Sequence, residues 1–152
     1  MDFDTLLIHA GMDTRDFPRA SSVPISQTST FPQDDPENAP HYYYSRGGNP
    51  TRDALEQAIA GMEHGAQGLA FASGIAAIAT TFLLFKPGDH VVACEDIYGG
   101  AYRLLTRIFQ RWNLEVDFAD ATDPEALARA IKPNTRALYV ETPSNPLLRV
   151  TD

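Results

Sequence analysis

The sequence predicts an α/β fold, with a mostly parallel sheet covered by helices and an extended N-terminal arm before it. Three observations lead to this prediction. Short apolar runs alternate with segments of helical periodicity after residue 49. The apolar runs are continuous, as expected for strands that helices bury on both faces. Residues 1–40, by contrast, contain five of the eleven prolines and little apolar periodicity.

The chain is predicted to divide into an extended arm, residues 1–45, and the first part of an α/β domain, residues 46–152. The arm has too little apolar surface to bury a core of its own. We therefore expect an extended arm that lies on another surface. The alternative, which composition alone favours, is a flexible tail.

The first long helix is predicted to begin at Asn49-Pro50, where a capping side chain precedes a proline at the first helical position. Gly65 is expected to end this helix in the left-handed conformation. Its apolar stripe consists of Leu55, Ile59 and Met62.

Four strands are predicted, at residues 68–72, 90–94, 115–119 and 135–140. A helix between each pair of consecutive strands implies right-handed crossovers and a mostly parallel sheet. We expect the first of these helices, residues 75–85, to be largely buried. The second begins at Gly99-Gly100 with Leu104, Leu105, Ile108 and Trp112 on one face, and the third follows Asp123-Pro124 and carries Leu127 and Ile131. We expect the domain to continue beyond Asp152, because no closing element follows the fourth strand.

The composition excludes several classes of function. Twenty acidic and twelve basic residues give a net charge of −8, which argues against a nucleic-acid surface and against docking on anionic lipid. No apolar run approaches the ~20 residues of a membrane span, and the N-terminus lacks the basic start of a signal peptide. The single cysteine, Cys94, fits a reducing compartment. We expect a cytoplasmic protein, and the scattered histidines predict no metal site.

Three loops are predicted to carry the functional site, because ligands of an open parallel sheet bind beyond the carboxyl ends of its strands. Ser73 and Gly74 begin a helix whose first amides have no acceptor, which suits a phosphate. Tyr98 is positioned to stack on a planar ligand. Glu141 and Asn145 provide an acid and an amide donor between prolines. A helix cap, a core tyrosine and a turn are the structural alternatives.

A fourth candidate segment, residues 41–46, joins the arm to the first helix. The guanidinium of Arg46 suits a phosphate, and the hydroxyl of Tyr44 adds a hydrogen-bond donor. The alternative is an aromatic hinge that packs on the domain.

Five motifs, in this order, resemble the Cys/Met metabolism enzymes that use pyridoxal 5'-phosphate. They are YYYSRGGNPTR at 42–52, LAFASGIAAI at 69–78, KPGDHVV at 86–92, EDIYGG at 95–100 and ETPSNP at 141–146. This family includes cystathionine γ-synthase, cystathionine γ-lyase, methionine γ-lyase and O-acetylhomoserine sulfhydrylase. The resemblance implies the large domain of a fold-type I enzyme. It covers the whole chain but less than half of a complete family member.

The resemblance also implies a role for each candidate residue. Tyr44, Ser45 and Arg46 would reach across a subunit interface to the cofactor phosphate of a neighbouring subunit. Ser73, Gly74 and Ile75 would hold the phosphate, although many relatives have Met in place of Ile75. Tyr98 would stack on the pyridine ring, and Tyr98 and Tyr44 are the catalytic candidates. Asn145 would donate to the phenolic oxygen with Glu141 nearby, and Gly100, where methionine γ-lyases often carry Cys, favours the cystathionine enzymes or the sulfhydrylases.

The family's Schiff-base lysine is not among the matched motifs. Lys86 and Lys132 are the chain's two lysines, and neither fits that motif. We therefore expect the N-terminal part of a transsulfuration enzyme that performs γ-elimination or γ-replacement on cystathionine or an O-acyl-homoserine. These 152 residues alone would be inactive, and the complete protein would be a homo-oligomer of active-site-sharing dimers.

Three alternatives remain open at this point. The first is a non-catalytic pseudo-enzyme or partner subunit of the same fold. The second is an enzyme of the methionine γ-lyase or O-acetylhomoserine sulfhydrylase type. The third is a generic phosphate-binding α/β module of another class.

Overall fold

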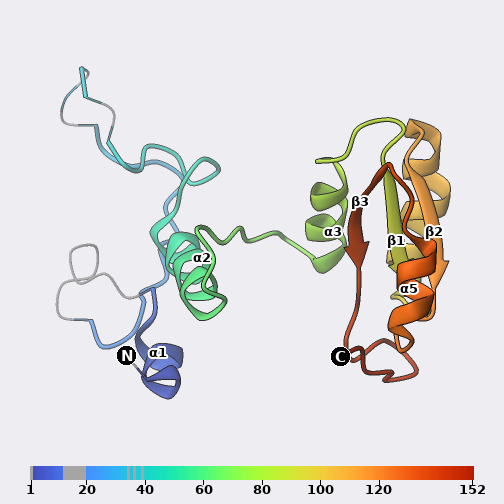
Figure 1. Cartoon of the computed structure of the whole chain (residues 1–152). Coiled ribbons are helices and arrows are strands. Elements are labelled where there is room, and N and C mark those ends of the chain that lie inside the picture. The colour runs from blue at the N-terminus through green and yellow to red at the C-terminus, as the bar shows by residue number, and fades with distance from the viewer. Residues whose placement is uncertain (1, 12–19, 34, 36, 39) are drawn as a thin grey trace. The chain divides into compact units, whose positions relative to one another are not determined.

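The computed structural model describes residues 2–11, 20–33, 35, 37–38 and 40–152 (Figure 1). Contacts divide the chain into two compact units, which we call unit 1 (Met1–Ala70) and unit 2 (Phe71–Asp152). The predicted division into an arm, 1–45, and a domain, 46–152, stays a prediction. Residues 1, 12–19, 34, 36 and 39 of that arm lie outside the described residues.

Unit 1 contains two helices, α1 (Phe3–His9) and α2 (Pro50–Met62). The predicted start of α2 is confirmed, because the Asn49 side chain accepts hydrogen bonds from the amides of Thr51 and Arg52 at 2.9 and 3.4 Å. The predicted end is wrong by one residue. His64, with φ 53°, adopts the left-handed conformation, and the amide of Gly65 then closes the turn on the carbonyl of Ala60 at 2.8 Å.

The N-terminal part of unit 1 is attached to α2. Residues 3–9 form α1 instead of extended chain, since Asp2 caps this helix and Leu6 reaches α2 beside Gly61. Gly11, with φ +77°, passes so close to α2 that a Cβ atom would stand 2.0 Å from the carbonyl oxygen of Ala54.

Residues 24–31 form no helix and take part in one isolated bridge, and hydrogen bonds tie them to the first turn of α2. The Thr51 hydroxyl donates to the carbonyl of Pro24 at 2.9 Å and accepts from the amide of Ser26 at 2.8 Å. The Asn49 amide donates to the carbonyl of Ser26 at 3.1 Å. Hydrogen bonds from Asn49 and Thr51, at the start of α2, therefore fix residues 24–26 in place of apolar packing.

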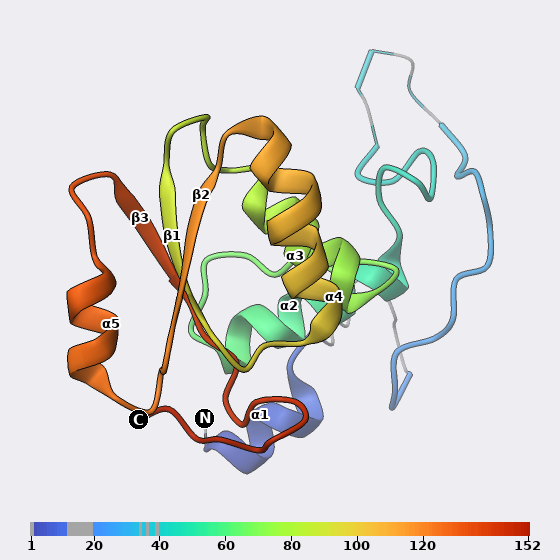
Figure 2. The ribbon, with the colours of Figure 1, turned by 90° about the vertical axis from the view of Figure 1, so that its right-hand side faces the viewer.

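Unit 2 is built on a parallel sheet of three strands in the order β2-β1-β3. The strands are β1 (His90–Cys94), β2 (Glu115–Ala119) and β3 (Thr135–Tyr139), which confirms three of the four predicted strands. Figure 2 shows α5 (Pro124–Ala130) on one face and α3 (Gly74–Phe82) with α4 (Gly99–Arg103) on the other. The predicted parallel sheet covered by helices is confirmed.

The strand predicted at residues 68–72 is absent from the described structure. The amide of Ala70 donates to the Glu56 carboxylate at 2.8 Å, so a side chain takes the place of a strand partner. The apolar side chains of Leu69 and Phe71 are exposed. A strand needs a paired neighbour as well as apolar residues, and the described part of the chain provides none here.

The helices of unit 2 differ from the prediction in their buried faces. In α3 only Phe82 is buried, so the prediction of a largely buried helix is wrong. A single face of α3 packs against the core. Beyond α4 the chain continues as a π-helical segment (Leu104–Ile108) and a 3₁₀ segment (Phe109–Trp112). Its buried residues, Ala101, Leu105 and Phe109, recur every fourth residue as the wider π turn requires, whereas the predicted Ile108 and Trp112 are exposed.

The last predicted helix is confirmed as α5, which Asp123 caps by accepting from the amide of Glu125 at 3.0 Å. Leu127 packs against the core of unit 2. Ile131 lies just beyond the helix and is exposed, unlike the prediction. Among the described residues, no helix combines the length and the apolar character needed to cross a membrane.

The core of unit 2 is centred on Phe82, which is 2% exposed. Its ring lies 5.8, 5.7 and 5.4 Å, between centroids, from the rings of Phe85, Phe109 and Tyr139. Trp112 packs edge-on against Phe109 at 5.5 Å, and both border an apolar pocket of about 340 Å³. Aromatic contacts therefore join α3, the segment after α4 and β3.

Replacing Phe82 tests this core. We expect Phe82→Ala to lower the free energy of unfolding by about 3–5 kcal/mol, because the change removes three ring contacts and leaves a cavity. Leu84→Ala is the control, since Leu84 is 79% exposed two residues further along the chain. Urea denaturation followed by circular dichroism measures both, and equal losses would contradict the assignment of Phe82 to the core.

Candidate functional site

Two of the three predicted loops meet at the carboxyl edge of the sheet in unit 2. Because β1 and β3 are neighbouring parallel strands, the loops that follow them leave the same edge. The amide of Tyr98, after β1, donates to the Glu141 carboxylate, after β3, at 2.8 Å. The remaining predicted loop, Ser73 and Gly74, is the start of α3. Figure 1 shows this first turn of α3 at the same end of unit 2.

Two further contacts join these loops, and together with the bond between Tyr98 and Glu141 they form what we call the loop clamp. The Ser144 hydroxyl donates to the Asp96 carboxylate and accepts from the amide of Arg149 at 3.0 Å. The Arg149 guanidinium pairs with Glu95 at 2.9 Å. Ser144 is only 3% exposed, so this polar contact is an internal one.

The sequence analysis did not select Asp96, Ser144 or Arg149. Asp96 and Ser144 stand inside the motifs at 95–100 and 141–146, yet neither residue resembles a ligand-binding group by itself. The sequence does show an acid, Asp96, and a hydroxyl, Ser144, in two loops that follow predicted strands. These two residues can be recognised as hydrogen-bond partners only when the order of the strands in the sheet is known.

Glu141 takes part in the clamp through both its side chain and its backbone. Besides accepting from Tyr98, its carboxylate accepts from the Tyr139 hydroxyl at 3.0 Å. Its amide donates to the Cys94 sulfur at 3.4 Å. Both side-chain oxygens of Glu141 and its backbone N–H therefore have partners inside unit 2.

These contacts place two ionisable groups in unfavourable surroundings for their charged forms. Burial, followed by the adjacent Glu141 carboxylate, raises the pKa of Tyr139. Burial also raises the pKa of the Cys94 thiol. Both groups therefore stay protonated near neutral pH, and neither is a candidate nucleophile or base.

The start of α3 is open, as the phosphate prediction requires. The Ser73 hydroxyl caps the helix by accepting from the amide of Ala76 at 3.3 Å, and Ser73 and Gly74 are exposed. Apart from its chain neighbours and the backbone of its own helix, no atom of the described residues lies within 4 Å of a Cβ built on Gly74. The amides of Gly74 and Ile75 have no acceptor within the described part of the chain. Free amides, a hydroxyl and open space suit an anion.

Tyr98 and Asn145 belong to the two loops that meet at this edge. The Tyr98 ring is 44% exposed and lies across the first turn of α4, where a Cβ on Gly100 would stand 2.3 Å from the ring. Asn145 is exposed, and no hydrogen bond between described residues uses its side chain. An aromatic face, a free amide and an open helix N-terminus together fit a phosphorylated aromatic ring.

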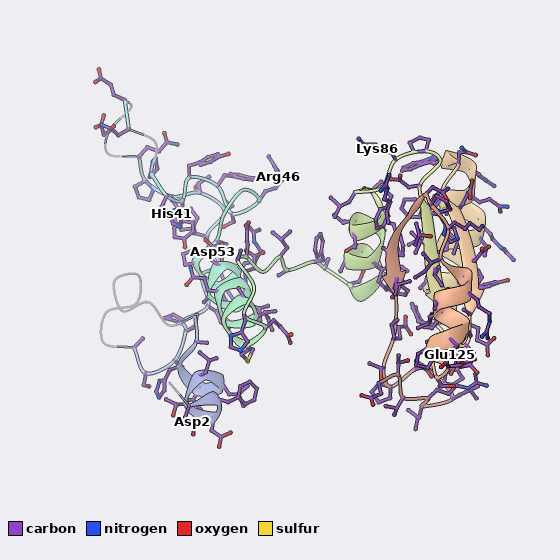
Figure 3. The ribbon with its side chains drawn as sticks, viewed as in Figure 1. Asp2, His41, Arg46, Asp53, Lys86 and Glu125 are labelled. Atoms are coloured by element: carbon purple, nitrogen blue, oxygen red, sulfur yellow. The ribbon has the colours of Figure 1, made fainter. Side chains whose placement is uncertain are left out.

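The candidates Tyr44, Ser45 and Arg46 lie in unit 1. Tyr44 forms an antiparallel bridge with Thr30, and the amide of Ser45 donates to the carbonyl of Ser29 at 2.9 Å. The Arg46 guanidinium stacks on the Tyr44 ring, 4.5 Å from its centroid. Arg46 is exposed and projects from its loop (Figure 3). This segment therefore presents a fixed aromatic–cation pair to solvent.

Neither lysine lies at the carboxyl edge of the sheet. Lys86 precedes β1 and lies at the opposite end of unit 2 (Figure 3). Lys132 shortly precedes β3 in the chain and therefore lies near the amino end of that strand. Its amine pairs with Asp117 of β2 at 2.8 Å. Any reaction that requires a lysine beside Tyr98 therefore needs one from outside these 152 residues.

Comparisons with known proteins agree with this geometry. Residues 4–152 match the family described as Cys/Met metabolism PLP-dependent enzyme. The chain is 50% identical to cystathionine beta-lyase of Bacillus subtilis and 48% identical to a probable cystathionine gamma-synthase of Herpetosiphon aurantiacus. These matches cover 98% and 97% of this chain but only 38% and 46% of the two relatives.

A solved structure gives the same result. The chain matches cystathionine gamma-lyase from Lactobacillus plantarum complexed with L-serine at 47% identity with a TM-score of 0.89. The match covers 99% of this chain and 39% of that one. The chain thus spans about two fifths of the length of such proteins.

The contact between Tyr139 and Glu141 predicts a weakening of unit 2 at alkaline pH. Because the folded-state pKa of Tyr139 exceeds its ordinary value of 10.0, the unfolded chain loses this proton first as the pH rises. The free energy of unfolding should therefore fall above about pH 10. Tyr139→Phe should flatten this fall, and it should also lower stability near neutral pH by removing one hydrogen bond.

Urea denaturation between pH 8 and pH 11 measures the effect. Tyr43→Phe is the matched control, because Tyr43 is 55% exposed in unit 1 and should keep the slope of the unaltered chain. An unchanged alkaline slope in Tyr139→Phe would show that Tyr139 does not carry the effect.

Proposed function

Because the chain belongs to the Cys/Met metabolism PLP-dependent enzyme family, we propose that it is the N-terminal part of an enzyme that makes or breaks a carbon–sulfur bond of cystathionine. The names of the matched relatives support cystathionine as the substrate or the product, since a beta-lyase and a gamma-lyase cleave it and a gamma-synthase forms it. The expected γ-elimination or γ-replacement on cystathionine or an O-acyl-homoserine is widened to include β-elimination, because a beta-lyase is among them.

The juxtaposition of Tyr98 with the loop at 141–145 is the observation that carries the proposal. When bound, pyridoxal phosphate supplies an electron sink that stabilises negative charge on the α-carbon of an amino acid. Ser73, with the free amides at the start of α3, would bind the phosphate through hydrogen bonds and the helix dipole. Tyr98 would hold the ring by stacking, and Asn145 would donate a hydrogen bond to its oxygen substituent.

Tyr44, Ser45 and Arg46 belong to the same proposal in a different role. Arg46 is exposed, its guanidinium stacks on the Tyr44 ring, and Tyr44 is held by its bridge to Thr30, so this pair suits an external anion such as a phosphate. We assign them to the cofactor phosphate of a second copy in a homo-oligomer, where Tyr44 would also contact the substrate. A small amino acid is the proposed substrate of that assembly.

The positions of Lys86 and Lys132 support the expectation that these 152 residues alone are inactive. Neither amine lies near Tyr98, whereas family members carry a Schiff-base lysine outside the motifs matched here. Proton transfer at the substrate would rest on that lysine, with the Tyr98 hydroxyl assisting from the carboxyl edge. If the chain were instead part of a non-catalytic subunit or a generic phosphate-binding module, no activity that depends on a lysine would be expected.

A chimera tests the proposed function. In it these 152 residues replace the matching residues of cystathionine beta-lyase of Bacillus subtilis, with which they share 50% identity. With pyridoxal phosphate and cystathionine, the chimera should release a thiol and the 152-residue chain should release none. Homocysteine indicates β-elimination, and cysteine indicates γ-elimination.

Point variants of the chimera assign the residues. Ser73→Ala and Tyr98→Ala should each weaken pyridoxal phosphate binding about tenfold, through a lost hydroxyl and lost stacking. Arg107→Ala, on an exposed helical surface, should have no effect. A folded chimera that binds no pyridoxal phosphate would overturn the proposal, and turnover by the 152 residues alone would overturn the lysine argument.

A further inference from the structure

We propose that Glu141 and Gly100 are the positioning residues of Tyr98, Glu141 by fixing its backbone and Gly100 by leaving room for its ring. The use of Tyr98 by a cofactor rests on the proposed function, whereas the positioning itself rests only on contacts within unit 2. This gives Glu141 a task other than contact with the cofactor.

The hydrogen bonds of Glu141 carry the first half of the inference. One carboxylate oxygen accepts from Tyr98 at 2.8 Å and the other accepts from Tyr139 at 3.0 Å, while the backbone N–H is taken by Cys94. These two hydrogen bonds fix the orientation of the Glu141 carboxylate on the loop after β3. The carboxylate is therefore a rigid acceptor for the amide of Tyr98 in the loop after β1.

The backbone of Tyr98 is held on both sides as a result. Its amide donates to Glu141, and its carbonyl accepts from the amide of Tyr102 at 3.1 Å as the first hydrogen bond of α4. Tyr98 is the N-cap residue of α4 and makes no side-chain cap hydrogen bond in the described structure, and Glu141 satisfies the amide of Tyr98 itself. The direction in which the Tyr98 side chain leaves the backbone is therefore fixed jointly by β3 and α4.

Gly100 carries the second half. A Cβ atom on Gly100 would stand 2.3, 2.7 and 2.9 Å from the Cε1, Cζ and Oη atoms of Tyr98, and real Cβ atoms do not come so close. Any other residue at position 100 must therefore push the ring aside. Gly99 is different, since its nearest neighbour would be the flexible end of Arg103 at 3.6 Å. The two glycines share the first turn of α4, so they form a matched pair.

The test uses the full 152-residue chain and nuclear magnetic resonance of Tyr98, with no cofactor added. In the unaltered chain, the Tyr98 ring should show a nuclear Overhauser effect to the α-protons of Gly100. Gly100→Ala should shift the ring resonances of Tyr98, and Gly99→Ala should leave them in place. Both substitutions raise helix propensity equally, so the comparison isolates the steric effect.

Glu141 is tested by hydrogen exchange at the Tyr98 amide. Glu141→Ala should speed this exchange about ten- to a hundredfold, the effect of losing a hydrogen bond to a charged acceptor. Glu141→Gln keeps an amide oxygen and should restore most of the protection. The amide of Val92 in β1 serves as the reference for global opening, because Val92 is fully buried and its exchange should change far less.

The positioning is overturned if Gly99→Ala and Gly100→Ala shift the ring equally, or if Glu141→Ala leaves the Tyr98 amide protected. Addition of pyridoxal phosphate then separates this inference from the proposed function. Shifted ring resonances in the unaltered chain support the use of Tyr98 by the cofactor. Unshifted resonances, with the variants behaving as expected, count against the proposed role of Tyr98 alone and leave the positioning established.

Discussion

The candidate site depends on the parallel pairing of β1 with β2 and β3. All five residues of β1 are buried, so this strand is the fixed reference for everything around it. Its parallel register with β3 sets the loops after Cys94 and Tyr139 side by side, although they are more than forty residues apart in the chain. An antiparallel neighbour would have placed these loops at opposite edges. The edge that carries Tyr98 and Glu141 is thus a consequence of the topology.

The contacts of the loop clamp do not contribute equally. The pair between Arg149 and Glu95 is partly exposed, and such pairs contribute about 0–1 kcal/mol. The hydroxyl of Ser144 and the carboxylate of Glu141 lie deeper, where a polar group without a partner costs about 1–3 kcal/mol. Stabilisation of the loops therefore comes chiefly from these two residues.

The sequence predicted those features that depend on local chemistry or on continuous apolar runs. The Asn49 cap and the strands at 90–94 and 115–119 belong to this group, as does the meeting of Tyr98 with Glu141 once a parallel sheet was assumed. The failures need information from distant parts of the chain. Residues 68–72 have strand composition without a partner, and the π turn after Arg103 changes which residues face the core. The pairing of Ser144 with Asp96 joins two loops through the register of the sheet, which composition does not encode.

Trp112 is the chain's single tryptophan, and it packs on Phe109 at the border of the apolar pocket in unit 2. Tyrosines are divided evenly, with residues 42–44 in unit 1 and Tyr98, Tyr102 and Tyr139 in unit 2. Indole emission excited selectively therefore reports on unit 2 alone, and unit 1 is silent in that signal. Tryptophan fluorescence therefore follows the unfolding of unit 2, while a signal from the whole chain, such as circular dichroism, follows both units. Comparing the two unfolding curves shows whether the units unfold together, without any added label.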